Sequence, residues 1–327
     1  MIGKLQSGTV LRERYKITDV VGRGGMGNVY RAEDLRLPGR LCAIKEVQPE
    51  ANISPEARLQ EQSQFLREAS LLAQLDHPNL PKVSDFFTDG GRDYLVMDFV
   101  PGKNLKEMID DSQVQGQKLS VKTVMEWALQ IMDAMEYLHN QDPPVLHRDI
   151  KPANIKLTPD DRIKLVDFGL AKVMTGDSSS TVTVIQGRGT AYYTPLEQYG
   201  AESEHTDVRS DIYAFGGTLY HLLAAQAPPE AKERFLNPAV LRSLQSINTE
   251  VDRNMSDSIH WALEMHPDDR PENVARLRST LLGEGPRPPR INDGKDGDSI
   301  ADAIKINSMI LLIAIGLFVL AVMLTLM

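Results

Sequence analysis

The sequence has one cysteine, Cys42, few aromatic residues (6%) and no excess of positive charge. A single cysteine cannot form a disulfide within the chain, which excludes a disulfide scaffold and is typical of proteins in a reducing compartment. Lys and Arg number 36 against 45 Asp and Glu, so the net charge is −9. A nucleic-acid-binding domain would show a basic excess, so no nucleic-acid partner is expected.

The remaining composition is ordinary, with 42% hydrophobic and 25% charged residues in a chain of 327. These values are typical of globular domains and exclude a wholly disordered or collagen-like chain. The length predicts one large domain or two of average size, and no repeat of solenoid period is present.

The last 19 residues, 309–327, contain no charged side chain. A helix of this length, at ~1.5 Å per residue, spans roughly 28 Å, about the hydrocarbon thickness of a bilayer. Only Thr325 in this run is polar, whereas a helix buried in a soluble core normally keeps a polar face. We therefore predict a transmembrane helix over 305–327, with a buried soluble helix as the alternative. No secretory signal peptide and no sizeable domain after the span are expected.

The segment before this run, 283–304, is rich in Gly, Pro and Asp, which predicts a flexible juxtamembrane linker. The expected organisation is an N-terminal lead over 1–14, a globular domain over 15–282, the linker and the span. Lys305 is the only basic residue close to the span, too weak a signal to set its orientation.

A glycine-rich segment follows the first predicted strand, Tyr15–Val21. Gly22, Gly24 and Gly27 match the pattern G-x-G-x-x-G, in which glycines let the backbone approach phosphates and offer amide donors. The same pattern opens dinucleotide-binding folds, but a helix follows it there. Strand-like residues follow it here, up to a strand over Leu41–Val47, so we predict a hairpin that covers a nucleotide.

Lys45 lies on that later strand and shares a face with Ala43 if the strand alternates. Ala43 could admit an adenine ring while the ammonium of Lys45 reaches phosphates; the alternative is a solvated surface lysine. A helix predicted over Pro55–Leu75 carries Glu68 beside its apolar stripe, where its carboxylate could pair with Lys45. Glu61, on the same helix, is the alternative partner.

Four polar residues, Asp149, Lys151, Asn154 and Asp167, lie within 19 residues of one another in sequence. They are set among apolar residues on two short hairpin-like runs, after a helix predicted over Val121–His139. Carboxylates and an amide oxygen are ligands suited to Mg²⁺, which keeps waters and binds phosphates. This cluster therefore predicts a site for metal-bound phosphate.

Together these motifs resemble, in order, the eukaryotic-like protein kinase family over about residues 15–282. The matching positions are Gly22 to Val29, Lys45, the run from His147 to Asn154, Asp167-Phe168-Gly169, Gly189-Thr190, Glu197, Asp211 and Arg270. The loop and the C-terminal run are similar to those of bacterial membrane-anchored serine/threonine kinases. The resemblance implies an α+β, two-lobed fold with a β-rich N-lobe (15–100) and a helical C-lobe (101–282), followed by the transmembrane helix.

The resemblance implies a role for each polar residue in an ATP-dependent phosphoryl transfer to serine or threonine hydroxyls. Asp149 would accept or orient the hydroxyl proton, Lys151 would stabilise the γ-phosphate, and Thr190 would bond both. Asn154 and Asp167 would hold Mg²⁺, with Mn²⁺ as an alternative. A lysine two residues after the aspartate is typical of the serine/threonine branch.

The resemblance also implies a nucleotide-binding set. It comprises Val21, Gly22, Arg23, Gly24, Gly25, Met26, Gly27, Asn28, Val29, Ala43, Lys45, Glu68, Met97, Asp98 and Val100. Within it, Lys45 would contact the α- and β-phosphates while Glu68 holds it, and the backbone from Asp98 to Val100 would form the hinge that meets adenine. Glu197, Asp211 and Arg270 are expected to be structural.

The sequence departs from the family at Lys156, where an apolar residue usually floors the adenine. Its methylene stem can pack there while its ammonium reaches water, and nucleotide affinity is the property this change bears on. Two further departures are a longer loop over 48–57 and Leu196 directly before Glu197.

Arg148 precedes Asp149, and kinases with this arginine are commonly switched by a phosphate on the activation loop. The corresponding loop, 170–189, contains the run GDSSSTVTV, in which Ser178, Ser179, Ser180, Thr181 and Thr183 are candidate phosphorylation sites. We predict autophosphorylation at Thr181 or Thr183, which a homodimer would allow in trans. The alternative is a serine-rich loop without a regulatory role.

Two other functions are alternatives: a membrane-tethered pseudokinase scaffold that binds nucleotide without turnover, and a phosphotransferase for small molecules. The complete set of Lys45, Asp149, Asn154 and Asp167 favours an active kinase with protein substrates. Because ATP lies inside the cell, the kinase domain is expected on the cytoplasmic side of the cell membrane, held by one span.

Overall fold

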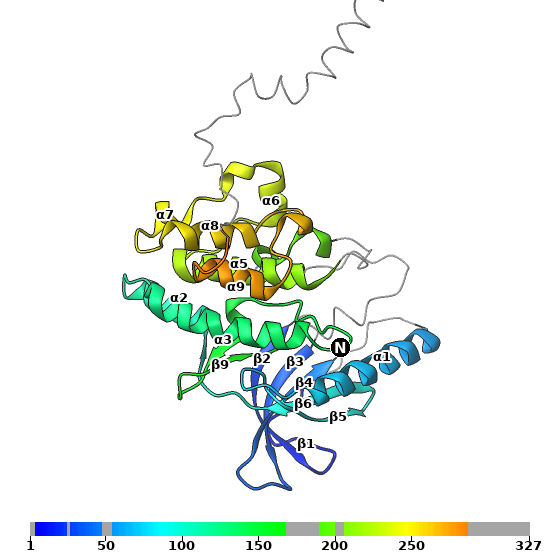
Figure 1. The fold of residues 1–327 in the computed structure, drawn as a ribbon. Helices are drawn as coiled ribbons and strands as arrows, with labels where there is room; N and C mark the ends of the chain where they lie inside the picture. Colours follow the sequence, from blue (N-terminus) through cyan, green and yellow to red (C-terminus); the bar gives the residue numbers. More distant parts are fainter. Residues whose placement is uncertain (1–3, 25–26, 48–53, 168–189, 200–205, 287–327) are drawn as a thin grey trace, which may run out of the picture. The chain divides into compact units, whose positions relative to one another are not determined.

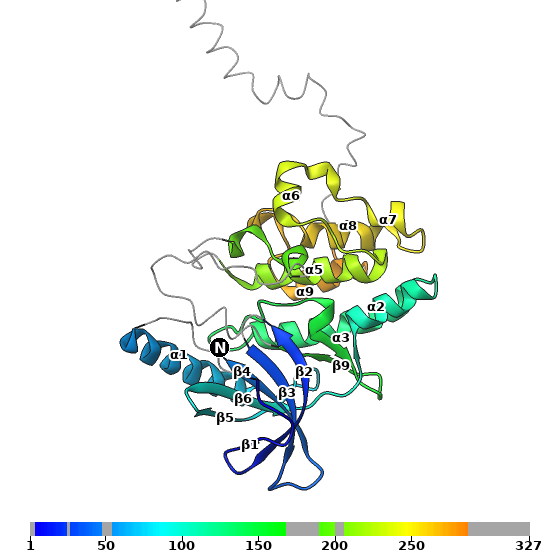
Figure 2. The ribbon, with the colours of Figure 1, turned by 180° about the vertical axis from the view of Figure 1, so that it is seen from behind.

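The computed structural model of the chain describes residues 4–24, 27–47, 54–167, 190–199 and 206–286. They form the predicted β-rich N-lobe and helical C-lobe (Figures 1 and 2). The predicted span, all but the start of the predicted linker, and four predicted site residues lie outside these ranges; the four are Gly25, Met26, Thr181 and Thr183. Within the ranges, no helix is long and apolar enough to cross a membrane.

The N-lobe is a six-stranded antiparallel sheet with the order β1-β2-β3-β4-β6-β5. Its strands are β1 (Val10–Leu11), β2 (Tyr15–Gly24), β3 (Gly27–Asp34), β4 (Leu41–Val47), β5 (Val83–Asp89) and β6 (Arg92–Asp98). Helix α1 (Pro55–Gln74) packs against β5 and β6, close to its predicted bounds. Strand β1 lies inside the predicted lead and extends the sheet by pairing with β2.

Each strand of this sheet sends alternate side chains to opposite faces. One face packs Tyr15, Tyr30 and Ile44 into a small core of its own. The other face packs Leu95 and other apolar residues into the main core together with α1. Neighbouring residues of β4 therefore face opposite sides of the sheet and lie in different environments.

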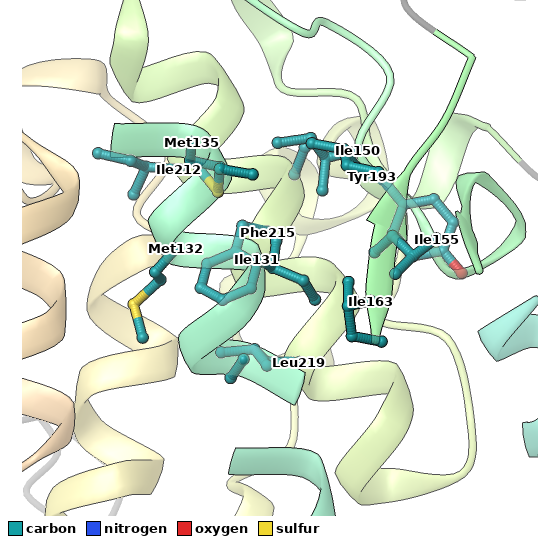
Figure 3. Close-up of a cluster of buried hydrophobic side chains, with 14 of the residues drawn as sticks. Ile131, Met132, Met135, Ile150, Ile155, Ile163, Tyr193, Ile212, Phe215 and Leu219 are labelled. Carbon is teal, nitrogen blue, oxygen red and sulfur yellow. The ribbon is translucent and has the colours of Figure 1, made fainter. Parts of the chain in front are cut away.

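The C-lobe is built around two long helices, α3 (Val121–His139) and α5 (Val208–Ala224). Ser120 caps α3 by accepting a hydrogen bond from the Thr123 backbone N–H, at the predicted start of that helix. The other α-helices in the described part of this lobe are α2 (Leu105–Val114), α6 (Ala231–Leu236), α7 (Leu244–Ile247), α8 (Arg253–Ala262) and α9 (Val274–Leu281). The side chain of Phe215, on α5, is fully buried among residues of α3 (Figure 3).

A second sheet, β7-β8-β9, carries the polar cluster predicted from the sequence. Its strands are β7 (Lys103–Asn104), β8 (Ile155–Leu157) and β9 (Ile163–Leu165), all antiparallel. Asn154 lies directly before β8, and Asp167 follows two residues after β9. Asn79, from the loop before β5, binds β9: its side-chain amide donates to the Ile163 carbonyl (2.8 Å), and its own carbonyl accepts from Leu165 N–H (2.8 Å).

Candidate active site

The run from His147 to Asn154 forms a loop between α3 and β8, and buried isoleucines fix it at two points. Ile150 and Ile155 are fully buried in the core shared with α3 and α5, and Figure 3 shows both side chains beside that core. Burying such a side chain contributes about 1.5–3 kcal/mol. The polar residues on either side of Ile150, Asp149 and Lys151, are therefore held at the surface of a packed core.

The four predicted catalytic residues meet at this loop. Lys151 Nζ lies 2.8 Å from Asp149 Oδ2 and 3.0 Å from Thr190 Oγ1. The Asn154 side-chain amide donates to Asp149 Oδ2 (2.8 Å) and to the Asp149 carbonyl (2.9 Å). One carboxylate oxygen is thus held by both an ammonium and an amide. Thr190, which is 41 positions after Asp149 in the chain, is brought into the cluster through Lys151.

The backbone of the loop is held by one buried carboxylate, that of Asp211 in the first turn of α5. Its oxygens accept hydrogen bonds from His147 N–H (2.8 Å) and Arg148 N–H (2.7 Å), and His139 Nε2 lies 3.0 Å away. Burial alone would raise the pKa of Asp211, but His139 and the backbone donors hold it below its usual value. Arg148 has a φ of 63°, a strained conformation that costs about 1–3 kcal/mol and needs such support.

The ring of His147 links this loop to the strand that precedes Asp167. His147 Nδ1 accepts from Asp149 N–H (3.4 Å), and Nε2 lies 3.2 Å from the Val166 carbonyl. Burial lowers the pKa of this fully buried imidazole, in keeping with a neutral ring that accepts at one nitrogen and donates at the other. The two predicted motifs, around Asp149 and Asp167, are therefore joined by direct hydrogen bonds.

Asp167 has a φ of 66° and forms an ion pair with Lys45 Nζ. Burial would raise the pKa of this carboxyl, but the ammonium of Lys45 beside it keeps the pKa below its usual value. Lys45 is therefore not a solvated surface lysine, the alternative left open by the sequence. The pair also brings β4 of the N-lobe to Asp167, the predicted metal ligand of the C-lobe.

Glu68 does not form the ion pair with Lys45 that the resemblance implies. Glu68 Oε1 accepts from Gln64 Nε2 (2.5 Å), and its buried Oε2 has no hydrogen-bond partner. Burial raises the pKa of Glu68 to about 7, and Gln64 and Arg148 oppose this only in part. In this arrangement Lys45 is held by Asp167 rather than by α1.

The strand register places the predicted adenine-facing residues together. Val29 pairs with Lys45, and Ala43 pairs with Met97, so these four side chains share one face of the sheet. The hinge follows directly after Met97. Asp98 N–H donates to the Lys82 carbonyl (3.0 Å), and Val100 N–H has no acceptor within the described ranges.

The glycine-rich segment is the predicted hairpin, with Gly22 opposite Val29 and Gly24 opposite Gly27. Gly27 has a φ of 142°, and a Cβ there would lie 1.9 Å from the Glu46 carbonyl oxygen, so only glycine can occupy the position. Val21 is half exposed, and Arg23 pairs in register with Asn28.

Asn28 takes part in a buried polar cluster that the sequence did not reveal. Its amide donates to Glu46 Oε2 (3.0 Å), which also accepts from Tyr30 Oη (2.7 Å). Arg92 Nη1 lies 2.5 Å from Glu46 Oε1. Glu46 faces away from Lys45, so the cluster anchors the base of the glycine-rich hairpin from the opposite side of the sheet. In the sequence, only the alternation of side chains along β4 could have predicted that Glu46 faces this side of the sheet.

Glu197 and Arg270 form a bidentate ion pair. Arg270 Nη1 and Nη2 lie 2.6 and 3.1 Å from the two oxygens of Glu197, and both side chains are nearly inaccessible to solvent. Burial would raise the pKa of Glu197, but Arg270 holds it below its usual value. The pair joins the segment after Thr190 to the end of the C-lobe, a geometry consistent with the structural role expected for both residues.

Comparison with known proteins agrees with this geometry. The family described as protein kinase domain matches residues 15–281, so the chain belongs to the protein kinase family. A probable serine/threonine-protein kinase of Streptomyces coelicolor is 39% identical over 220 residues, covering 66% of this chain and 31% of that protein. The probable serine/threonine-protein kinase PknB of Lactococcus lactis is 35% identical over 224 residues, covering 68% and 34%. The chain thus spans about a third of the length of these relatives.

Solved structures agree in fold. An apo form of PpkA superposes with a TM-score of 0.69 at 26% identity, covering 85% of this chain and 99% of that one. The kinase domain of PknI from Mycobacterium tuberculosis, as a variant, gives 0.65 at 25% identity, covering 86% and 99%. The two-lobed fold predicted from the motifs is therefore confirmed.

The raised pKa of Glu68 predicts a pH-dependent change in stability. An exposed glutamate has a pKa of about 4.3, so folding is penalised as the pH rises from there through about 7 and the buried carboxylate ionises. We expect Glu68→Gln to leave the free energy of unfolding nearly unchanged at about pH 4.5 and to raise it, relative to wild type, at about pH 8. Urea unfolding across this range measures the difference.

Glu61→Gln is the matched control, because Glu61 lies on the same helix but makes an ion pair with Arg58. It should show no gain in stability that grows with pH. A Glu68→Gln variant whose difference from wild type is constant across the range would contradict the assignment of the buried acid.

Proposed function

We propose that the chain is an ATP-dependent protein kinase that transfers the γ-phosphate to serine and threonine hydroxyls. The observation that carries the proposal is the contact of Lys151 with both Asp149 and Thr190, on a loop fixed by Asp211. An ammonium beside a carboxylate at the surface of a packed loop is suited to a hydroxyl that must lose a proton next to a phosphate.

In the proposed reaction the hydroxyl oxygen of the substrate attacks the γ-phosphorus. The bond to the β–γ bridging oxygen breaks, ADP leaves, and the hydroxyl proton passes to the Asp149 carboxylate. Lys151 already lies beside Asp149 and would stabilise the negative charge that spreads over the γ-phosphate oxygens. Thr190 holds Lys151 from the other side and so restricts its position.

The residues present suit Mg²⁺, or Mn²⁺ in its place. Asp167 supplies a carboxylate, and because the Asn154 amide nitrogen donates to Asp149, its Oδ1 is the atom left for a ligand. Two protein oxygens together with phosphate oxygens are a usual set for Mg²⁺. When bound, the ion would neutralise charge on the β- and γ-phosphates. Lys45, which pairs with Asp167 in this structure, would then contact the α- and β-phosphates. Its ammonium would also become the ionic partner of Glu68.

A pseudokinase scaffold is the other function that could follow from the same fold. It is not favoured, because each position that the chemistry requires is occupied by a competent residue. A small-molecule phosphotransferase is disfavoured by the segment up to Glu197 and its ion pair with Arg270, which in kinases supports the platform for a protein substrate.

Replacing Asp149 by Asn should abolish most of the transfer while leaving nucleotide bound. Loss of general-base catalysis typically costs about 10²–10⁴-fold in rate. We expect at least a 100-fold lower rate of transfer from radiolabelled ATP to a generic basic protein, with ATP affinity changed less than threefold. Equal transfer by wild type and variant would contradict the role, and ATP binding without transfer by wild type would favour the scaffold.

The same two proteins test autophosphorylation, which we propose at Thr181 or Thr183 on the predicted activation loop. The proposal is supported by Arg148, next to Asp149, whose cationic side chain could pair with a phosphate. Mass spectrometry should find phosphate on wild type and none on Asp149→Asn. Equal phosphate on both would contradict it. A concentration-dependent rate would further support transfer between two copies.

We also propose that residues 305–327 span the cell membrane once, with the kinase domain on the cytoplasmic side where ATP is available. The uncharged run over 309–327 supports this. The full chain should stay with membranes after an alkaline carbonate wash, and a chain ended after Ile304 should be released. A full chain that is released as readily as the shortened one would contradict the span.

A further inference from the structure

Lys156 lies on β8, the central strand of the small sheet, and its ammonium is bound to backbone, a contact that the sequence did not predict. Lys156 Nζ donates to the Val100 carbonyl over 2.7 Å and lies 5.6 Å from the centre of the Phe99 ring. Both contacts are with the hinge. Lys156, which stands where an apolar residue usually packs under adenine, therefore binds the hinge backbone that the base would contact.

The strand register explains why Lys156 is held there. Lys156 pairs directly with Lys164 on β9, so two like charges share one face of the sheet. Each ammonium ends on its own backbone carbonyl, that of Val100 for Lys156 and that of Leu80 for Lys164 (3.0 Å). Burial lowers the pKa of both lysines, and a partly buried ammonium needs an acceptor. The Val100 carbonyl thus supplies the acceptor that the Lys156 ammonium requires.

The two polar atoms of the Val100 backbone differ in what they offer a ligand. In extended chain, the N–H and C=O of one residue point to the same side. Val100 N–H has no acceptor within the described ranges, whereas its carbonyl already accepts from Lys156. If adenine N1 accepts from Val100 N–H, the neighbouring C2 atom of the ring faces this carbonyl and its ammonium. This step rests on the proposed function, in which the hinge binds the base of ATP.

We propose that Lys156 is a base-specificity residue that admits adenine and rejects an adenine that carries a 2-amino group. Adenine has only a hydrogen on C2, while 2-aminoadenine has there the amino donor that guanine also carries. That donor would face the ammonium of Lys156, another donor, which already occupies one of the two lone pairs of the Val100 carbonyl. A buried donor without an acceptor is costly, and sites that leave one discriminate strongly.

The sharpest probe is the pair of ATP and 2-amino-ATP, which differ only in the amino group on C2. On the full-length wild-type chain, we expect 2-amino-ATP to bind about tenfold more weakly than ATP in equilibrium competition. In Lys156→Met the Val100 carbonyl is released and can accept from the 2-amino group, so the two affinities should become equal or reverse.

Lys164→Met is the matched control. It removes the ammonium that pairs in register with Lys156 but binds the Leu80 carbonyl, which lies outside the hinge. This variant should keep the wild-type ratio of the affinities for ATP and 2-amino-ATP. Equal binding of ATP and 2-amino-ATP by wild type overturns the inference, and this measurement does not depend on the folding of any variant. So does an unchanged ratio in a Lys156→Met chain that binds ATP. Failure of wild type to bind any purine triphosphate would instead overturn the proposed function itself, and this inference with it.

Discussion

The buried carboxylate of Asp211 is the contact on which the rest of the site depends. It accepts from two successive backbone N–H groups, of His147 and Arg148, in a stretch whose positive φ would otherwise be unfavourable. Because these amides are fixed, the next residue, Asp149, leaves the core at a defined point. A carboxylate buried this deeply requires several hydrogen-bond donors. Because the loop supplies two of them, the buried carboxylate also fixes the position of the loop.

The charges around the nucleotide position form an arrangement suited to a ligand. Lys45 pairs with Asp167, and Glu68 is buried with a raised pKa beside Gln64. Each of these groups would gain a better partner if phosphates and a metal ion entered: Lys45 a phosphate, Asp167 a cation, and Glu68 the released ammonium. Binding of nucleotide and metal, as proposed, would therefore exchange the present pairs for these new ones.

Much of the fold followed from local pattern. The helix over Val121–His139 and the strand over Leu41–Val47 have their predicted bounds, because cap residues and alternation are local signals. The meeting of Asp149, Lys151 and Asn154 was also predictable, since they lie at most five positions apart in one loop. The pairing of Lys45 was not: it depends on where α1 sits against the sheet, a long-range packing choice that no local pattern encodes.

Two further features escaped prediction for the same kind of reason. The sequence analysis did not single out Glu46, which lies beside the small second core under β3 and β4 as a buried partner of Arg92 and Asn28. Lys156 was expected to reach water, but its amine is captured by the Val100 carbonyl. In both cases, a polar side chain is held by an acceptor or donor that is distant in sequence.

Phosphoamino-acid analysis of a basic protein incubated with the wild-type chain, Mg²⁺ and γ-labelled ATP is the most direct measurement of the central claim. We expect the label on phosphoserine and phosphothreonine, because Lys151 and Thr190 hold Asp149 for an aliphatic hydroxyl. Label found only on phosphotyrosine, or no labelled protein while ATP remains bound, would contradict it.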